Sequence, residues 1–202
     1  RFLQSAGIRA ASDAGAAGAA SALWDQAQGL FGDPSEDTSF FSTLDQAFSA
    51  FSVLSDAPTS SAARAGALAQ VSEFFNQSQT ISDQLQNLRD QADAQIRSDV
   101  ERVNQLLEQI NELNAEISRG RIMSGDATGP QNKQLQLIDE LSSLMDVKGS
   151  PLDQGGYVVR ASDGMMLAGE GAAKFSYDGT GARGELSVTS PVGRTQLFGA
   201  RL

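Results

Sequence analysis

The sequence predicts an α+β fold: an elongated helical hairpin or bundle with one very long helix, followed by a small antiparallel β domain. Three observations support this class. No proline falls between Thr59 and Pro130, and apolar residues recur there at steps of three and four. Only one glycine occurs in residues 33–119. From Gly149 onward glycine appears eleven times, and short alternating apolar runs replace the helical pattern.

This change of character predicts two domains. We expect an elongated α-helical domain over residues 1–146 and a β-rich domain over residues 147–202, which the printed sequence need not contain in full. The glycine- and proline-containing stretch at 148–156 is interpreted as the junction between them.

The first helices follow from composition and turn signals. An alanine-rich helix is expected over about residues 3–28, followed by a turn at 32–37 where aspartate, serine and proline cluster. A helix over about 39–55 comes next, because apolar residues fall on one face. That face carries Phe40, Leu44, Phe48, Phe51 and Leu54.

The main feature is a helix over about residues 60–119, roughly 90 Å long at 1.5 Å per residue. Its apolar stripe has the rhythm of a coiled-coil seam, with an inserted step between Leu88 and Val100. A loop at 118–129 and a return helix at 130–146 should follow. The return helix is expected to present Leu135, Ile138, Leu141, Leu144 and Met145. Residues 104–117 should pack on it and on the phenylalanine-bearing helix.

The β part contains five short apolar runs with glycine-rich connections, which predict a meander of hairpins. The expected strands are 157–161, 165–169, 174–178, 185–190 and 195–198.

Charge and missing residue types narrow the function. The net charge of −10 disfavours nucleic acid and anionic membrane surfaces as partners. Cysteine and histidine are absent, which excludes thiol and histidine nucleophile systems and most zinc sites. We therefore expect no enzyme, no cofactor, no metal, no small-molecule substrate and no catalytic residue. No transmembrane helix and no cleaved signal are visible, and the start at Arg1 indicates a trimmed fragment.

Several tempting motifs have simpler interpretations. The segment GTGARG at 179–184 matches a dinucleotide fingerprint, but a strand-like run follows it, so a hairpin loop is expected. Glu108, Glu112 and Glu116 are expected to form a solvated helix face rather than a metal site. The segment at 33–37 is expected to be a turn rather than a calcium loop. Trp24 is assigned to a core or interface. The phenylalanines at 40, 41, 48 and 51 are assigned to the core, with the alternative that some face another subunit.

Residues 20–146 resemble the flagellar hook-associated protein 1 family, the first of the two hook–filament junction proteins. Each motif is weakly specific, but their order and spacing together are more so. The matching pieces are Phe31–Gly32–Asp33–Pro34, Phe48–Ser49–Ala50–Phe51, Asp56–Ala57–Pro58, Ala62–Ala63–Arg64, Val103–Asn104–Gln105–Leu106 and Ile110–Asn111–Glu112–Leu113–Asn114. In the return helix the family's arginine is replaced by Ile138, which puts any ion pair of that arginine in doubt.

The resemblance implies a structural protein of the flagellar axis, a core fragment without the terminal coiled-coil segments. It implies self-assembly into a ring, contacts with hook protein and the second junction protein, and an export chaperone for the full-length protein. It also implies an extracellular location reached by type III export without a cleaved signal. Two alternatives stay open: a sibling axial protein such as the second junction protein or a flagellin, and a secreted coiled-coil adhesin or effector with a β binding domain.

Overall fold

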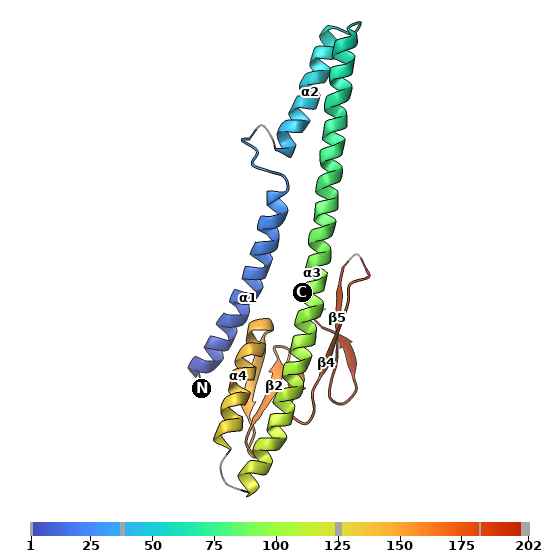
Figure 1. Ribbon diagram of the computed structural model, residues 1–202. Helices are drawn as coiled ribbons and strands as arrows, with labels where there is room; N and C mark the ends of the chain where they lie inside the picture. The colour runs from blue at the N-terminus through green and yellow to red at the C-terminus, as the bar shows by residue number, and fades with distance from the viewer. Residues whose placement is uncertain (1, 37–38, 124–126, 182, 199–202) are drawn as a thin grey trace. The chain divides into compact units, whose positions relative to one another are not determined.

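A computed structural model describes residues 2–36, 39–123, 127–181 and 183–198, with side chains from residue 14 onward except residue 16. The described chain runs through four helices and then six strands (Figure 1). Contacts divide it into two compact units, residues 19–92 and residues 1–18 with 93–202. Helices α1 (Phe2–Gly29) and α3 (Ser61–Met123) contribute to both. The division at residue 147 into two domains stays a prediction.

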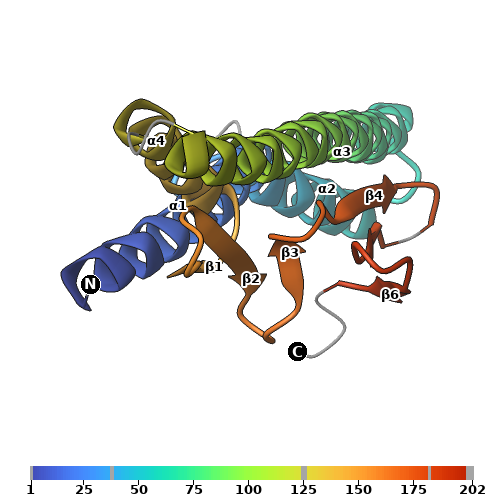
Figure 2. The same ribbon diagram turned by 90° about the horizontal axis from the view of Figure 1, so that it is seen from below.

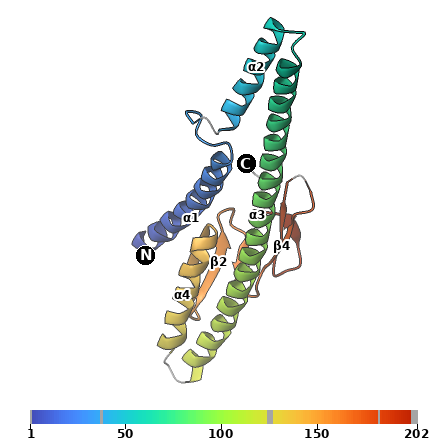
Figure 3. The same ribbon diagram turned by 45° about the horizontal axis from the view of Figure 1, so that its top comes forward.

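The first unit contains α2 (Phe40–Asp56) and the beginning of α3, which run antiparallel after a short turn (Figures 1 and 3). Helix α2 starts where expected because the Ser39 hydroxyl accepts a hydrogen bond from the Ser42 N–H. Ala47 and Ala67, both small, are buried in this unit. The rings of Phe40 and Phe74 lie 5.3 Å apart and join the two helices.

Helix α3 confirms the very long helix and extends four residues beyond the expected end at residue 119. The middle of α3 is mostly exposed, so local contacts must support it. Three glutamine side chains donate to an aspartate four residues later, which stabilises a helix surface. These pairs are Gln79–Asp83 at 2.8 Å, Gln86–Asp90 at 3.0 Å and Gln95–Asp99 at 2.9 Å.

The second unit is built on the last part of α3 and on α4 (Thr128–Leu144), which lie side by side (Figures 1 and 3). Pro130 lies in the first turn of α4, as expected. The expected loop is shorter than 118–129, and its residues 124–126 lie outside the described part of the chain. The expected inner face of α4 is partly wrong. Ile138 and Leu141 are buried, but Leu137 is buried in place of Leu135, and Leu144 is 38% exposed.

Two three-stranded antiparallel sheets complete this unit (Figure 2). Strands β1 (Val147–Pro151), β2 (Tyr157–Ala161) and β3 (Met166–Ala168) form the first sheet in that order. Strands β4 (Lys174–Asp178), β5 (Glu185–Thr189) and β6 (Thr195–Leu197) form the second. The single expected meander is therefore two.

Strand β1 corrects the assignment of residues 148–156 as a plain junction. All five of its residues pair with β2, from Val147 opposite Ala161 to Pro151 opposite Tyr157. Gly149 and Pro151 gave no strand signal, but a proline at the end of an edge strand removes no needed donor. The buried Val147 side chain and the partner strand decide the conformation.

The apolar stripe at the end of α3 packs into the core of this unit. Leu106, Leu107 and Ile110 are fully buried in one core with residues of α4 and of both sheets. The sheets supply the buried residues Val147, Val159, Ala161, Leu167, Ala168, Phe175 and Val188. Helix α2, which we also expected on this seam, belongs to the other unit.

Candidate functional site

The residues weighed as possible chemical sites do not come together. Glu108, Glu112 and Glu116 are exposed on α3. Among the described residues no group of three or more acidic side chains is arranged to hold a metal ion. No helix in the described part of the chain is long and apolar enough to cross a membrane.

The glycine-rich segment 179–184 connects β4 to β5, which confirms the expected hairpin loop; Ala182 lies outside the described residues. Two of its glycines have a packing role. A Cβ on Gly184 would overlap the Tyr177 hydroxyl, and one on Gly179 would lie 3.2 Å from the same ring. The glycines therefore make room for a tyrosine rather than for a phosphate.

Tyr177 anchors this hairpin to α3. Its hydroxyl donates to Asp93 Oδ1 at 2.5 Å, and the Arg97 guanidinium lies 6.0 Å from the centre of its ring. A hydrogen bond to a carboxylate is stronger than one between neutral groups, so this contact holds the loop end of the second sheet.

Asn104 holds the same sheet near its other end. Its side-chain amide donates to the Phe175 carbonyl oxygen at 2.9 Å and accepts from the Phe175 N–H at 2.7 Å. The side chain thus pairs with both backbone groups of one residue, as an adjacent strand would. The outer edge of β4 is closed by a helix side chain at this point.

Asn114 makes the same contact with the first sheet. Its amide donates to the Tyr157 carbonyl oxygen at 2.9 Å and accepts from the Tyr157 N–H at 2.9 Å. The Gln134 amide of α4 donates both to Asn114 Oδ1 and to the Ile110 carbonyl oxygen. Gly156, at φ 86°, permits the close approach because a Cβ there would overlap Asn114 Oδ1. Helix α3, helix α4 and the first sheet therefore meet at one buried amide.

A second link joins the two helices at the surface. Arg102 forms an ion pair with Glu140, with Nε donating to Oε1 at 2.6 Å. Both side chains are 41% exposed, so the pair contributes about 0–1 kcal/mol.

The turn that follows α1 is closed by its own side chains. The Ser35 hydroxyl and N–H both donate to Asp33 Oδ1, and these bonds lower the pKa of Asp33. In the β4–β5 loop the N–H and hydroxyl of Thr180 lower the pKa of Asp178 in the same way. Residues 33–36 thus form the expected turn, and residue 37 lies outside the described part of the chain.

The phenylalanines of α2 differ from expectation. Phe41, Phe48 and Phe51 are 46%, 65% and 50% exposed, so their assignment to the core is wrong for the isolated chain. Leu68 and Phe75 of α3 are 69% and 63% exposed. We call these five residues the apolar face.

Helix geometry places the apolar face on one side of the hairpin. Each of its residues directly follows a buried or half-buried one, such as Ala47 before Phe48 and Ala67 before Leu68. Because both helices are right-handed and run in opposite directions, the residue after an inward-facing one lies on the same side of the pair in each. Apolar groups gathered in this way form an exposed apolar patch, a feature typical of interaction surfaces. Trp24 is also exposed, at 71%, and does not join the core.

Sequence reasoning did not assign Asn104, Asn114 or Tyr177 a role. A signal for the asparagines was present, since both lie in motifs that carried the family resemblance, in Val103–Leu106 and Ile110–Asn114. Their partners lie 71 and 43 residues away in sequence, and no local pattern predicts such pairs.

A search of protein-family models finds a match over residues 24–197 to the flagellar hook-associated protein FlgK helical domain. The chain belongs to this family. Membership confirms the resemblance drawn from the motifs between Phe31 and Asn114.

Two individual comparisons agree with the family. "Flagellar hook-associated protein 1" of Bacillus subtilis (strain 168) is 33% identical over 96 residues, which are 48% of this chain and 18% of that protein. The structure of "the flagellar hook junction protein FlgK from Burkholderia pseudomallei" matches with a TM-score of 0.84 at 17% identity. That match covers 96% of this chain and 36% of the other. The chain therefore spans about a fifth to a third of these relatives, and the solved structure confirms the α+β fold.

Proposed function

We propose that the chain is a structural, non-enzymatic part of the bacterial flagellum, an adaptor that joins the hook to the filament. The observation that carries the proposal is the family match over residues 24–197. The fold shared with a flagellar hook junction protein supports it. The absence of cysteine and histidine from the sequence is compatible with a structural role.

The proposed partners are other copies in a ring, the hook protein and the second junction protein, with an export chaperone for the full-length protein. The proposed location is outside the cell, after export without a cleaved signal. The apolar face supports an assembling role, because five large exposed side chains on one side of a hairpin are costly for a chain that stays alone in water.

The test is deletion of the gene in a flagellated host, followed by electron microscopy of the cells and an assay of the medium for filament protein. We expect bare hooks, with filament protein shed into the medium, and restored filaments when the full-length gene is returned. Normal attached filaments in the deletion strain would contradict the proposal.

Two of the alternatives give different results in the same experiment, whereas loss of a second junction protein would also leave bare hooks, so only the family match separates the two junction proteins. Loss of a flagellin removes its protein from the medium as well as from the hook. Loss of a secreted adhesin leaves motility intact. The family match favours the hook-associated role over both.

A further inference from the structure

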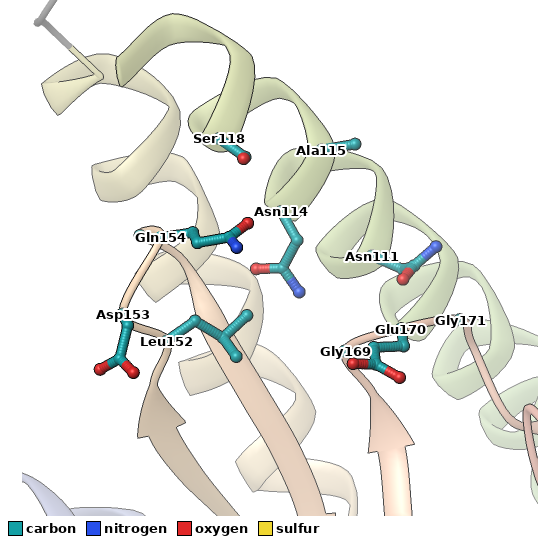
Figure 4. Close-up of a pocket in the computed structure, with 11 residues that line it drawn as sticks. Asn111, Asn114, Ala115, Ser118, Leu152, Asp153, Gln154, Gly169, Glu170 and Gly171 are labelled. Atoms are coloured by element: carbon teal, nitrogen blue, oxygen red, sulfur yellow. The ribbon is translucent and has the colours of Figure 1, made fainter. Parts of the chain in front are cut away.

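A pocket of about 440 Å³ lies between the last turns of α3 and two loops of the first sheet (Figure 4). Its walls are one face of α3 from Asn111 to Ser118, the β1–β2 turn at 152–155 and the β3–β4 loop at 169–171. All of these elements belong to one compact unit. The volume is within the range of pockets that hold small ligands.

The polar side chains of this pocket have unused hydrogen-bonding capacity. Asn111, Ser118, Gln154 and Glu170 line it, and their side chains make no hydrogen bond within the part of the chain that the structure describes. Figure 4 shows the amide of Gln154 directed into this space, whereas the nearby Asn114 amide is already paired with Tyr157 and Gln134. Two amides and a hydroxyl offer donors and acceptors together, whereas a carboxylate offers acceptors only.

Glycines hold the loops of the pocket against their surroundings. Gly155 has φ 90°, and a Cβ there would lie 2.9 Å from Ile117 Cγ2. Gly171 has φ 149°, and a Cβ there would lie 2.9 Å from Pro191 Cβ. Other residues are strained at these angles and would clash, so the β1–β2 turn lies close to α3 and the β3–β4 loop lies close to Pro191.

Two other asparagines of α3 pair with the backbone of extended segments. Asn104 and Asn114 each pair with both backbone groups of one residue in an extended segment. Asn111 lies one turn before Asn114 and has the same chemistry, and its side chain has no partner among the described residues. Glu170 supplies a carboxylate to the pocket lining, whereas the Asp153 carboxylate points away from it (Figure 4). The lining residues include no basic side chain, and the Arg121 guanidinium beside the turn is directed at the Asp153 carbonyl oxygen, so the charge of the lining disfavours an acidic ligand.

We propose that this pocket binds a short extended peptide segment with neutral or basic side chains, and that Asn111 pairs with the N–H and C=O of one of its residues. Gln154 and Ser118 supply further hydrogen bonds to the backbone, and Glu170 faces a basic side chain. The proposal concerns the isolated chain and does not depend on the role at the hook–filament junction.

The test is a titration followed by NMR of the isotope-labelled chain, with N-acetyl-Gly-Lys-Gly-amide as the probe. We expect saturable shifts of the Asn111 side-chain amide and of the backbone amides of Gly155, Gly169 and Gly171. The matching peptide with glutamate in place of lysine should bind at least about threefold more weakly.

Variants separate the pocket from general surface effects. Asn111→Leu should weaken binding of the lysine peptide by at least about tenfold. Gln154→Ala, in the exposed β1–β2 turn, should also weaken this binding. Asn76→Leu, an exposed asparagine on the same helix in the other unit, is the control and should change nothing. Absence of saturable shifts, equal binding of both peptides, or binding unaffected by both pocket variants would overturn the proposal. Stronger shifts with a polyol such as trehalose would also overturn it, in favour of a carbohydrate site.

Discussion

Replacement of Asn114 by alanine tests whether one side chain attaches the first sheet to the helices. The change removes the donor to the Tyr157 carbonyl and the acceptor for both the Tyr157 N–H and the Gln134 amide. Asn114 is 7% exposed and Gln134 fully buried, so water replaces these partners poorly. Buried polar groups left unpaired cost about 1–3 kcal/mol each, and the half-exposed Tyr157 recovers part of its loss. Alanine returns about 0.5 kcal/mol of helix propensity. The net cost is therefore about 2–4 kcal/mol.

Hydrogen exchange read by mass spectrometry measures this cost where it occurs. A loss of about 2–4 kcal/mol speeds exchange in peptides from β1 and β2 by roughly 30- to 700-fold, since 1.4 kcal/mol corresponds to a factor of ten. Peptides from residues 61–90, in the other unit, should be unchanged. The matched control is Asn111→Ala, three residues earlier on the same helix, whose side chain makes no hydrogen bond to the described residues. Its stability should stay within about 0.5 kcal/mol of the unsubstituted chain. The reasoning fails if β1–β2 peptides exchange equally fast in the two variants.

Three further changes have defined outcomes. Tyr177→Phe removes the hydrogen bond to Asp93 but keeps the ring, so β4–β5 peptides should exchange about fivefold faster, a loss of about 1 kcal/mol; unchanged exchange would show that this bond contributes nothing. Ser35→Ala removes the hydroxyl hydrogen bond that is the largest cause of the lowered pKa of Asp33, so an NMR titration should show this pKa rise, and an unchanged pKa would contradict the assignment. Because the pKa of Asp33 is lowered in the folded chain, the contribution of this turn to stability is present at neutral pH and is lost as pH falls through that pKa. Gly66→Ala adds a methyl group that meets nothing within 4 Å in an exposed helix, so the midpoint of urea denaturation should rise by an amount equivalent to about 0.8–1 kcal/mol, and a fall would indicate an unrecognised contact.

The helices were predictable because each carries its signal locally. The seam from Leu106 to Ile117 repeats at steps of three and four, and capping serines stand directly before α2 and α3. Strand β1 was not predictable from the sequence, because Gly149 and Pro151 disfavour a strand. In the structure its pairing with β2 outweighs that preference. Which side of a stripe is covered is also a tertiary matter. The periodicity marked Phe48 and Phe51 as apolar, but it did not show that α3 leaves them exposed.

The attachment of the sheets escaped prediction for a different reason. In a sequence, an asparagine that bonds a distant strand cannot be told from one on a solvated helix surface, and no residue near Asn104 indicates that its partner is Phe175. Tyr177 was similarly hidden, although the glycines on both sides of its loop were conspicuous. The expected hairpin loop is confirmed, but the sequence did not show that two of its glycines give space to the ring of Tyr177.

Strand β1 and the contact at Asn104 together bear on how these small sheets avoid sticking to other strands. An open sheet edge presents unpaired backbone groups and invites another chain to add a strand. The edge of β4 is blocked at Phe175 by an asparagine, and that of β3 is followed by its own chain, where the Ala173 N–H donates to the Leu167 carbonyl. The edge of β1 carries Lys148 and ends in a proline, and β6 is only three residues long. Each edge of the described sheets is thus blocked, charged or short. Such sheets can be crowded at high local concentration with little tendency to aggregate through their edges.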